Sequence, residues 1–428
     1  MRTFLTFTIS FFICVLCQGQ IKIIKTQNKA IKDVSEVLIP ISNSPDSLND
    51  LEFLKNVLSD KRIVYLGESN HHSETYNKIK LRLIKFLHSE MGFNVIAFES
   101  NISSCIHSNL VKDSLGPLYL LTHTINGCWR TESNYELMSY IKDEDINITG
   151  FDPNLNSLIL DKKYYQTFFP NNSGLSTNLF VLDSTFQAYD IDRSKYLHSK
   201  KENLFTENEL NEIRDSLTHQ YSDFLDNSNS SKQFQLLKIT IKNKLKILGA
   251  SNHFLDNIES QYVTDENREQ MMGQNLEFIL DSIFPNQKVI IWAHNGHISK
   301  GGKSTDYKIK NSFLNNSIGY RLNQKYGSQS YVIGLYGYPG IIGKGYPTET
   351  ESLVRPMKKS LENIMFNCNI SSCFVTTDIA CFKKPLYNFT EGNFTPLSII
   401  SDCYDAIIYF RNLEPAVLIR FKDRDKYK

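Results

Sequence analysis

The sequence lacks several features that would place it in common functional classes. Its 47 Lys and Arg residues nearly balance 46 Asp and Glu residues, and the formal net charge of +1 gives no field that favours nucleic acid or an anionic membrane. Beyond residue 20, no apolar run reaches spanning length and no CxxC motif or zinc-finger spacing occurs. A GxSxG motif is also missing, which argues against a serine nucleophile on a strand-to-helix elbow. We therefore expect neither nucleic-acid binding nor stable membrane insertion of the mature chain.

The composition that remains is that of a globular protein. Its 428 residues are 41% hydrophobic and 12% aromatic, enough for a large core in one big domain or two smaller ones. Between Asp152 and about Asn286 the sequence changes from apolar strand-like runs to polar helical segments. We interpret residues 20–428 as one domain with a helical insertion, about residues 155–286, that caps the site.

The N-terminus has the pattern of a secretory signal peptide. Arg2 precedes an apolar stretch over residues 4–16, and Gly19 offers a small residue for cleavage. The pattern predicts removal of residues 1–19 and export to the periplasm or the medium; a retained membrane anchor is the alternative, although the stretch is short for one. The six cysteines that follow permit disulfides, with Cys368 and Cys373 a plausible local pair.

The segment IVYLGESNHH, residues 63–72, combines a buried strand with ionisable groups. Four apolar residues predict a strand covered on both faces, and Gly67 ends it at a turn. Glu68 and His71 follow directly, and a carboxylate three residues from an imidazole can act as orienter and base. His72 is expected to point elsewhere on the loop.

A helix and a second strand follow this segment. Residues 74–91 have helical apolar spacing, with Ser73 before them and Gly92 after them, and residues 46–59, which precede the segment, have helical apolar spacing too. Lys80 lies within the apolar stripe, where it can reach back toward the acids or simply extend to water. The strand at 94–98 ends in Glu99, and the helical crossover predicts that it runs parallel to the first strand.

Two more apolar strands end in ionisable residues. The run at 146–151 precedes Asp152, and the run at 288–293 precedes His294 and His297. Carboxyl ends of parallel strands meet at one edge of a sheet, where ligands bind in open α/β folds. The sequence therefore predicts an α/β fold with a mostly parallel central sheet flanked by helices, and a functional site that gathers Glu68, His71, Glu99, His294 and His297.

These motifs also resemble those of a known family. The runs LGESNHHSE, GFNVIAFE and WAHNGH, together with the GFD that ends at Asp152, resemble the motifs of the erythromycin esterase family in order and spacing. Weaker similarities include Trp129 and Arg268. The sequence departs from the family pattern at His72, where a small residue is usual, and at Glu269, where Asp is usual.

The resemblance implies a metal-independent hydrolase that opens a macrolide lactone ester without a cofactor. Carried over by position, the family's essential acids correspond to Glu68 and Glu99, and its catalytic histidine to His71. Its paired histidines correspond to His294 and His297, and its basic residue in the following helix to Lys80. The implied partner is a small-molecule ester or lactone.

The leading mechanism is ester hydrolysis by an activated water. His71, oriented by Glu68 or Glu99, takes the proton from water, while His294, His297 and Lys80 stabilise the oxyanion and protonate the leaving alcohol. One alternative is a zinc hydrolase that holds its metal with His71, His294 and His297. Another alternative is an exported protein that binds a small ligand without turnover.

Overall fold

The computed structural model describes most of the chain between residues 27 and 419. The described ranges are 27–42, 47–153, 162–169, 171–199, 205–226, 232–250, 259–301, 317–344, 349–353, 355–390, 393–394 and 397–419. The predicted signal peptide, residues 1–19, lies outside them. Among the helices in these ranges, none is long and apolar enough to cross a membrane.

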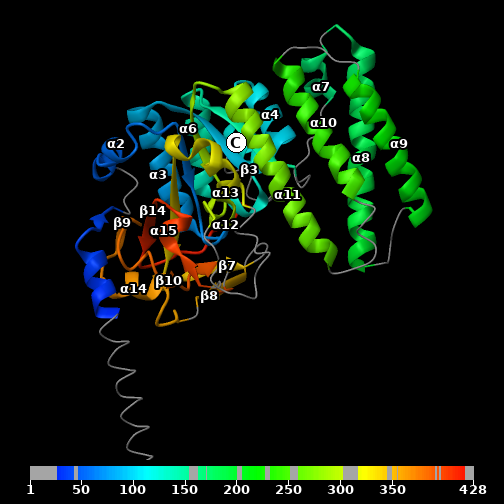
Figure 1. The fold of residues 1–428 in the computed structure, drawn as a ribbon. Helices are drawn as coiled ribbons and strands as arrows, with labels where there is room; N and C mark the ends of the chain where they lie inside the picture. Colours follow the sequence, from blue (N-terminus) through cyan, green and yellow to red (C-terminus); the bar gives the residue numbers. More distant parts are fainter. Residues whose placement is uncertain are drawn as a thin grey trace, which may run out of the picture.

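An eight-stranded sheet forms the centre of the fold (Figure 1). Its strand order is β1-β9-β14-β6-β2-β5-β3-β4, in which the six strands from β14 to β4 are parallel and β9 is antiparallel to β14. The bounds are β1 Ile39–Pro40, β2 Ile63–Leu66, β3 Phe93–Asn101, β4 Asn147–Asp152, β5 Lys288–Trp292, β6 Ser330–Gly337, β9 Ser372–Thr376 and β14 Ala406–Phe410. The predicted α/β class with a mostly parallel sheet is confirmed.

The central strand β2 shows why these apolar runs become strands. All four of its residues are buried, and alternate side chains belong to two different cores: Ile63 and Tyr65 to one, Val64 and Leu66 to the other. Burial on both faces removes apolar surface from water on each side of the sheet. The sheet is therefore the middle layer of three.

Helices cover both faces of the sheet. Those that pack in the core of Val64 and Leu66 are α2 Leu54–Val57, α3 Glu74–Met91, α5 Pro117–Thr124 and α6 Glu132–Asp143. Those that pack in the core of Ile63 and Tyr65 include α4 Ile102–Val111, α13 Ile318–Tyr326, α14 Leu361–Asn367 and α15 Ile400–Cys403. The predicted helix α3 is confirmed, and Gly92 ends it with a φ of 73° in the left-handed region that favours glycine.

A group of helices follows β4. The described part of residues 155–286 consists of α7 Lys162–Phe168, α8 Ser173–Ser199, α9 Glu207–Asp226, α10 Lys232–Ala250, α11 Glu259–Phe278 and a π-helical turn, η4 Ile279–Ile283. Helices α7 to α10 stand together beside the sheet, with α11 between them and the α/β core (Figure 1). The segment is thus helical where it is described, and its interpretation as a cap stays a prediction.

The remaining elements are short. Three small antiparallel pairs join β7 Ile341–Lys344 to β8 Glu349–Ser352, β10 Pro385–Leu386 to β13 Ser398–Ile399, and β11 Phe389–Thr390 to β12 Asn393–Phe394. Single helical turns occur at η1 Asn49–Leu51, η2 Gly127–Trp129, α12 Asn295–Ile298 and η6 Gly327–Gln329. Two of these turns, η2 and α12, carry side chains of the site described below.

Two expectations about the fold are wrong. The disulfide between Cys368 and Cys373 does not form, and both residues are free thiols. Cys368 is the C-cap residue of α14, and its Sγ lies 3.4 Å from the carbonyl oxygen of Ile364, while Cys373 is buried in β9. The apolar spacing over residues 46–59 predicted one helix, but the chain forms η1 and α2 as separate turns. The carboxylate of Asp50 accepts hydrogen bonds from outside this segment, which holds η1 against its neighbours.

Candidate active site

The carboxyl ends of four neighbouring strands meet at one edge of the sheet. In the order β2-β5-β3-β4, these ends carry Glu68, His294, Glu99 and Asp152. The registers Leu66 to Trp292 and Phe98 to Trp292 show that the strands reach this edge at the same level. Because each of these side chains comes at the end of a parallel strand, residues that lie far apart along the chain meet at this edge.

Glu68 is a buried carboxylate that accepts three hydrogen bonds. Its Oε1 accepts from Nδ1 of His71 and from Nε1 of Trp129, each at 2.7 Å, and its Oε2 accepts from Nζ of Lys80 at 2.6 Å. Burial raises the pKa of Glu68, but the charge of Lys80 and the hydrogen bonds outweigh burial and leave the pKa below its ordinary value. The group is therefore an anion at neutral pH.

Lys80 lies beneath this carboxylate. Its side chain is fully buried on α3, and Nζ lies 4.1 Å from the ring centroid of Trp292, a cation–π contact. The sequence left open whether Lys80 reaches the acids or water, and the structure shows the contact with Glu68. Because the ammonium group is enclosed, it acts on the site through Glu68.

His71 is the most exposed member of this group. Its side chain is 27% exposed while that of Glu68 is 1% exposed. The Nδ1–H group donates to Glu68, so the ring presents Nε2 as the nitrogen that can take a proton. The ring centroid lies 5.0 Å from that of His294 and 5.4 Å from that of Trp129. His71 thus combines an oriented ring with access to solvent.

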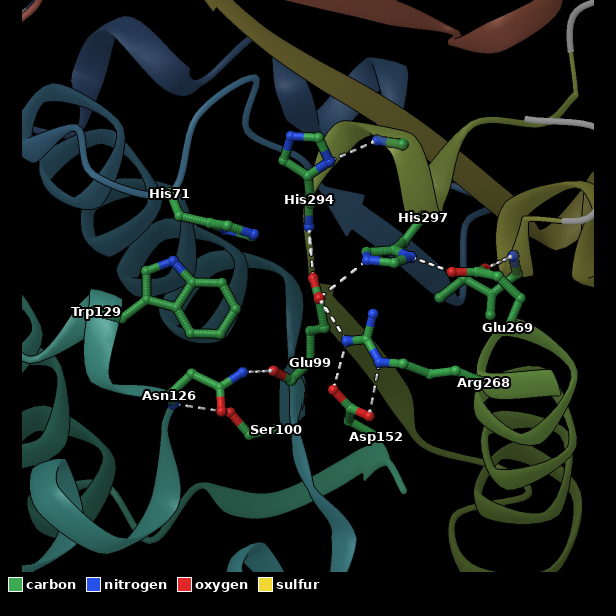
Figure 2. A network of polar contacts seen from close by, with 12 residues as sticks. His71, Glu99, Ser100, Asn126, Trp129, Asp152, Arg268, Glu269, His294 and His297 are labelled. Carbon is green, nitrogen blue, oxygen red and sulfur yellow. Dashed lines mark hydrogen bonds and ion pairs between the residues drawn. The ribbon is translucent and has the colours of Figure 1, made fainter. Parts of the chain in front are cut away.

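Glu99 is the centre of a second network (Figure 2). Its Oε1 contacts Nη2 of Arg268 at 3.1 Å and Nε2 of His297 at 3.0 Å, and its Oε2 accepts from the backbone N–H of His294 at 2.9 Å. Arg268 also donates to both carboxylate oxygens of Asp152. Burial raises the pKa of Glu99, but His297 and the neighbouring cations hold it well below the usual range.

His297 lies between two carboxylates. Its Nε2 faces Glu99 and its Nδ1 faces Glu269, which comes from α11. Burial alone lowers the pKa of this imidazole, but the two anions raise it to about 10. His297 is therefore a cation at neutral pH, and both of its N–H groups are directed at protein carboxylates.

His294 has the opposite electrostatic state. Burial, with the nearby His71 and His297, lowers its pKa to about 3, so the ring is neutral. It occupies the N-cap position of α12, where Nδ1 accepts from the N–H of Gly296 at 3.1 Å. A neutral ring that accepts at Nδ1 carries its proton at Nε2. His294 is thus a hydrogen-bond donor whose ring faces His71.

The turn after β2 is packed tightly against the turn after β5. A Cβ added to Gly67 would lie 2.0 Å from Oδ1 of Asn295, which shows why glycine is needed there. The N–H of Asn295 donates to the carbonyl of Glu68 at 2.8 Å, and its side chain bonds both the N–H and the carbonyl of Leu335. These bonds fix the two loops that carry His71 and His294.

The structure brings all six predicted site residues to this edge, in two groups that meet at the rings of His71 and His294. The first group holds Glu68, His71 and Lys80, and the second holds Glu99, His294 and His297. The backbone carbonyl of His72 accepts from the N–H groups of Gly343 and Ala416, which anchors the β7–β8 hairpin and the C-terminal segment. Burial, with the charge of the neighbouring His71, lowers the pKa of the His72 ring.

Four residues of the site were not among the predicted ones. They are Trp129, Asp152, Arg268 and Glu269. Asp152 follows a strand as Glu99 does, and Trp129 and Arg268 are among the family-like positions, so the sequence held a signal for these three. Glu269 stood out only as a departure from the family pattern.

Comparison with known proteins shows the family of this chain. The model of the erythromycin esterase family matches residues 88–413. The chain belongs to the erythromycin esterase family. Family membership supports a hydrolase with a small-molecule substrate.

Relatives and one solved structure cover most of the chain. The YbfO protein of Bacillus subtilis (strain 168) is 28% identical over 417 residues, 89% of this chain and 90% of that protein. Erythromycin esterase type II of Escherichia coli is 25% identical over 388 residues, 81% of this chain and 87% of that protein. A crystal structure of a Bacillus cereus protein shares the fold, with a TM-score of 0.70 at 18% identity, over 92% of this chain and 99% of that one.

The histidines of this erythromycin esterase family member are not arranged as zinc ligands. A zinc site built from His71, His294 and His297 needs one ring nitrogen from each histidine. Both nitrogens of His297 instead face Glu99 and Glu269. Within the described ranges, no group of three or more His, Cys, Asp or Glu side chains is placed to hold a metal ion.

Proposed function

We propose that the protein hydrolyses a carboxylic ester or lactone with a water molecule that His71 activates. The observation that carries this proposal is the pair of bonds through Glu68, which accepts from Nδ1 of His71 while it pairs with Lys80. A buried carboxylate that fixes the tautomer of a solvent-accessible imidazole is the arrangement of a general base and its orienter.

The reaction proceeds in two steps. Nε2 of His71 takes a proton from water as the water oxygen bonds to the substrate carbonyl carbon, which gives a tetrahedral oxyanion. The oxyanion then collapses and breaks the bond to the leaving oxygen, which takes the proton back from His71. The products are a carboxylic acid and an alcohol, or one hydroxy acid from a lactone.

The neutral His294 is suited to stabilise the oxyanion. Its Nε2–H is a donor in a buried site beside His71, where a hydrogen bond to developing charge is stronger than in water. His297 differs from His294, because both of its N–H groups already face carboxylates. We therefore assign His294 to the oxyanion and His297 to the support of Glu99.

A screen of esters and lactones with purified protein tests the proposed function. Macrolides are the first lactones to include, because the Escherichia coli relative is named an erythromycin esterase. Turnover in isotopically labelled water is expected to place the label in the carboxylate product. Binding without turnover across the panel would contradict hydrolysis and favour a ligand-binding protein.

The base is tested by a matched pair of variants. His71→Asn is expected to lower kcat by ~10² to 10⁴-fold, the usual contribution of a general base. His88→Asn makes the same change near the end of α3, where the ring of His88 contacts Tyr140 of α6, and should keep the wild-type rate. Activity that disappears with a chelator and returns with zinc would exclude the metal-free mechanism.

We also propose that the protein acts outside the cytoplasm, because its first 19 residues have the charged, apolar and small-residue order of a signal peptide. Cell fractionation followed by N-terminal sequencing of the mature protein tests this. An intact Met1 on protein recovered from the cytoplasm would contradict export.

A further inference from the structure

Helix α11 contributes two adjacent charged residues to the site. Arg268 pairs with Asp152 and Glu99, while Glu269 contacts His297 and accepts from the backbone N–H of Ile318 at 2.9 Å. Neighbouring residues on a helix point about 100° apart, so the two side chains serve different partners. The Arg268 side chain is 27% exposed, whereas Glu269 is enclosed. Glu269 therefore acts only through the groups that it touches.

The first of these groups is the imidazole of His297. Nδ1 contacts Oε1 of Glu269, and Nε2 lies 3.0 Å from Oε1 of Glu99. An imidazole that donates to a carboxylate at each nitrogen must carry both protons. The carboxylates of Glu99 and Glu269 therefore keep the His297 ring protonated and occupy both of its N–H groups, so neither N–H group can donate to a substrate.

The next link is Glu99. Its Oε1 faces the cation of His297, and its Oε2 accepts from the N–H of His294 (Figure 2). The orientation of this carboxylate therefore sets the position of the His294 backbone, which carries the ring that faces His71. A continuous series of contacts runs from Glu269 through His297 and Glu99 to His294.

From this series we propose that Glu269 is a positioning residue of the hydrolytic site, which acts on His294 through His297 and Glu99. The inference rests on the proposed hydrolysis. It assigns a role to a residue that lies on the helix linking the helical segment to the sheet, away from the strand ends that carry the reacting groups.

The variant that tests the role is Glu269→Gln, which removes the charge and keeps the size. We expect kcat to fall on the order of 100-fold, the effect of displacing a reacting group by about 1 Å, while KM changes little. Glu269→Asp keeps the charge one methylene shorter and is expected to recover part of kcat. A loss of folded protein would also lower apparent kcat at unchanged KM, so kcat is referred to the concentration of folded enzyme, measured by circular dichroism and denaturation of each variant.

The same helix provides a matched control. Glu277 on α11 pairs with Arg321 on α13 at 3.1 Å, and Glu269 likewise contacts α13 at its first residue, Ile318. The two glutamates differ in that Glu269, and not Glu277, contacts His297. Glu277→Gln is therefore expected to keep kcat within about twofold, since partly exposed pairs contribute little. Equal losses of kcat in Glu269→Gln and Glu277→Gln would overturn the proposal.

Nitrogen NMR of histidine-labelled protein tests the arrangement without any substrate. In the wild type, the two ring nitrogens of His297, assigned by their loss in His297→Asn, should both show the shifts of an imidazolium. Glu269→Gln is expected to change these shifts and that of the His294 amide. A neutral His297 ring in the wild type, or an unchanged His294 amide in the variant, would overturn the proposal.

The two measurements separate this inference from the proposed function. If no ester is hydrolysed but the NMR signals behave as expected, the proposed function fails and the link from Glu269 to His294 stands. If esters are hydrolysed and a folded Glu269→Gln keeps the wild-type kcat, the positioning role fails alone. If Glu269→Gln does not fold, Glu269→Asp decides: full kcat with altered His294 and His297 signals would refute the role.

Discussion

The Nζ atom of Lys80 lies 2.6 Å from Oε2 of Glu68, and both side chains are buried beneath His71. Removing one partner of such a pair leaves an uncompensated charge in the interior. We therefore expect Lys80→Met to lower the free energy of unfolding by about 3–5 kcal/mol. Chemical denaturation at neutral pH measures this, with Lys85→Met as the control, since Lys85 of the same helix forms a partly exposed pair with Glu136 of α6. Equal stability of Lys80→Met and Lys85→Met would contradict the prediction.

The double variant Lys80→Met/Glu68→Gln separates the stabilising role of the pair from its catalytic role. Without either charge, the desolvation cost disappears, so the double variant should be more stable than Lys80→Met. It should nevertheless stay at least ~10²-fold below the wild type in kcat, because the neutral amide that replaces the Glu68 carboxylate no longer stabilises a protonated His71. Denaturation and steady-state kinetics on the same preparations test both statements. Recovery of activity together with stability would show that Glu68 serves folding alone.

The two tryptophans near Lys80 allow a matched comparison. Trp129 donates to Oε1 of Glu68 at 2.7 Å, whereas Trp292 meets Lys80 through its ring face. Both are buried, so Trp129→Phe and Trp292→Phe remove similar volume, but only the first removes a hydrogen bond to the carboxylate. We expect kcat to fall about 10-fold more in Trp129→Phe, which corresponds to about 1.4 kcal/mol. Steady-state kinetics on both variants decides, and a larger kcat loss in Trp292→Phe would contradict the role of the Trp129 donor.

The sequence predicted the part of the site that local patterns encode. Glu68, Glu99 and His294 each follow an apolar run, and parallel strands place such positions at one edge whatever the details of packing. The partners of these residues are a different matter. His297 faces Glu269, and Glu99 faces Arg268, because α11 packs against the carboxyl edge of the sheet. Local residue spacing in the sequence does not encode that packing. Tertiary packing thus decided the roles within a set of residues that pattern alone had identified.

The same distinction explains the errors. Cysteine spacing permitted a bond between Cys368 and Cys373, but the direction of the Cys368 side chain is set by the end of α14. Apolar spacing over residues 46–59 was correct about burial, since Leu51, Leu54 and Leu58 are buried. It was wrong about continuity, because the N–H groups of Leu51, Glu52 and Lys55 bond to carbonyls three residues back, the tighter pattern of short 3₁₀ turns rather than of one α-helix.

Glu362, in the first turn of α14, is a buried acid away from the site. Its carboxylate accepts from the N–H of Phe389 at 2.6 Å, yet burial raises its pKa from 4.5 to about 7. Between about pH 4.5 and 7 the folded state therefore holds a proton that the unfolded state has released. Stability contributed by this group is present below about pH 4.5 and is lost as the pH rises to about 7, by about 3 kcal/mol in total.

Glu362→Gln tests this linkage because glutamine cannot release the proton. The variant should be more stable than the wild type at pH 8, and the difference between the two should shrink as the pH falls toward about 4.5. Urea unfolding of both proteins across this range measures the difference, in which contributions from other titrating groups cancel. Glu136→Gln changes a mostly exposed carboxylate, so its curve of unfolding free energy against pH should run parallel to that of the wild type. A Glu362→Gln curve that also runs parallel to the wild type would show that Glu362 is ionised in the folded protein.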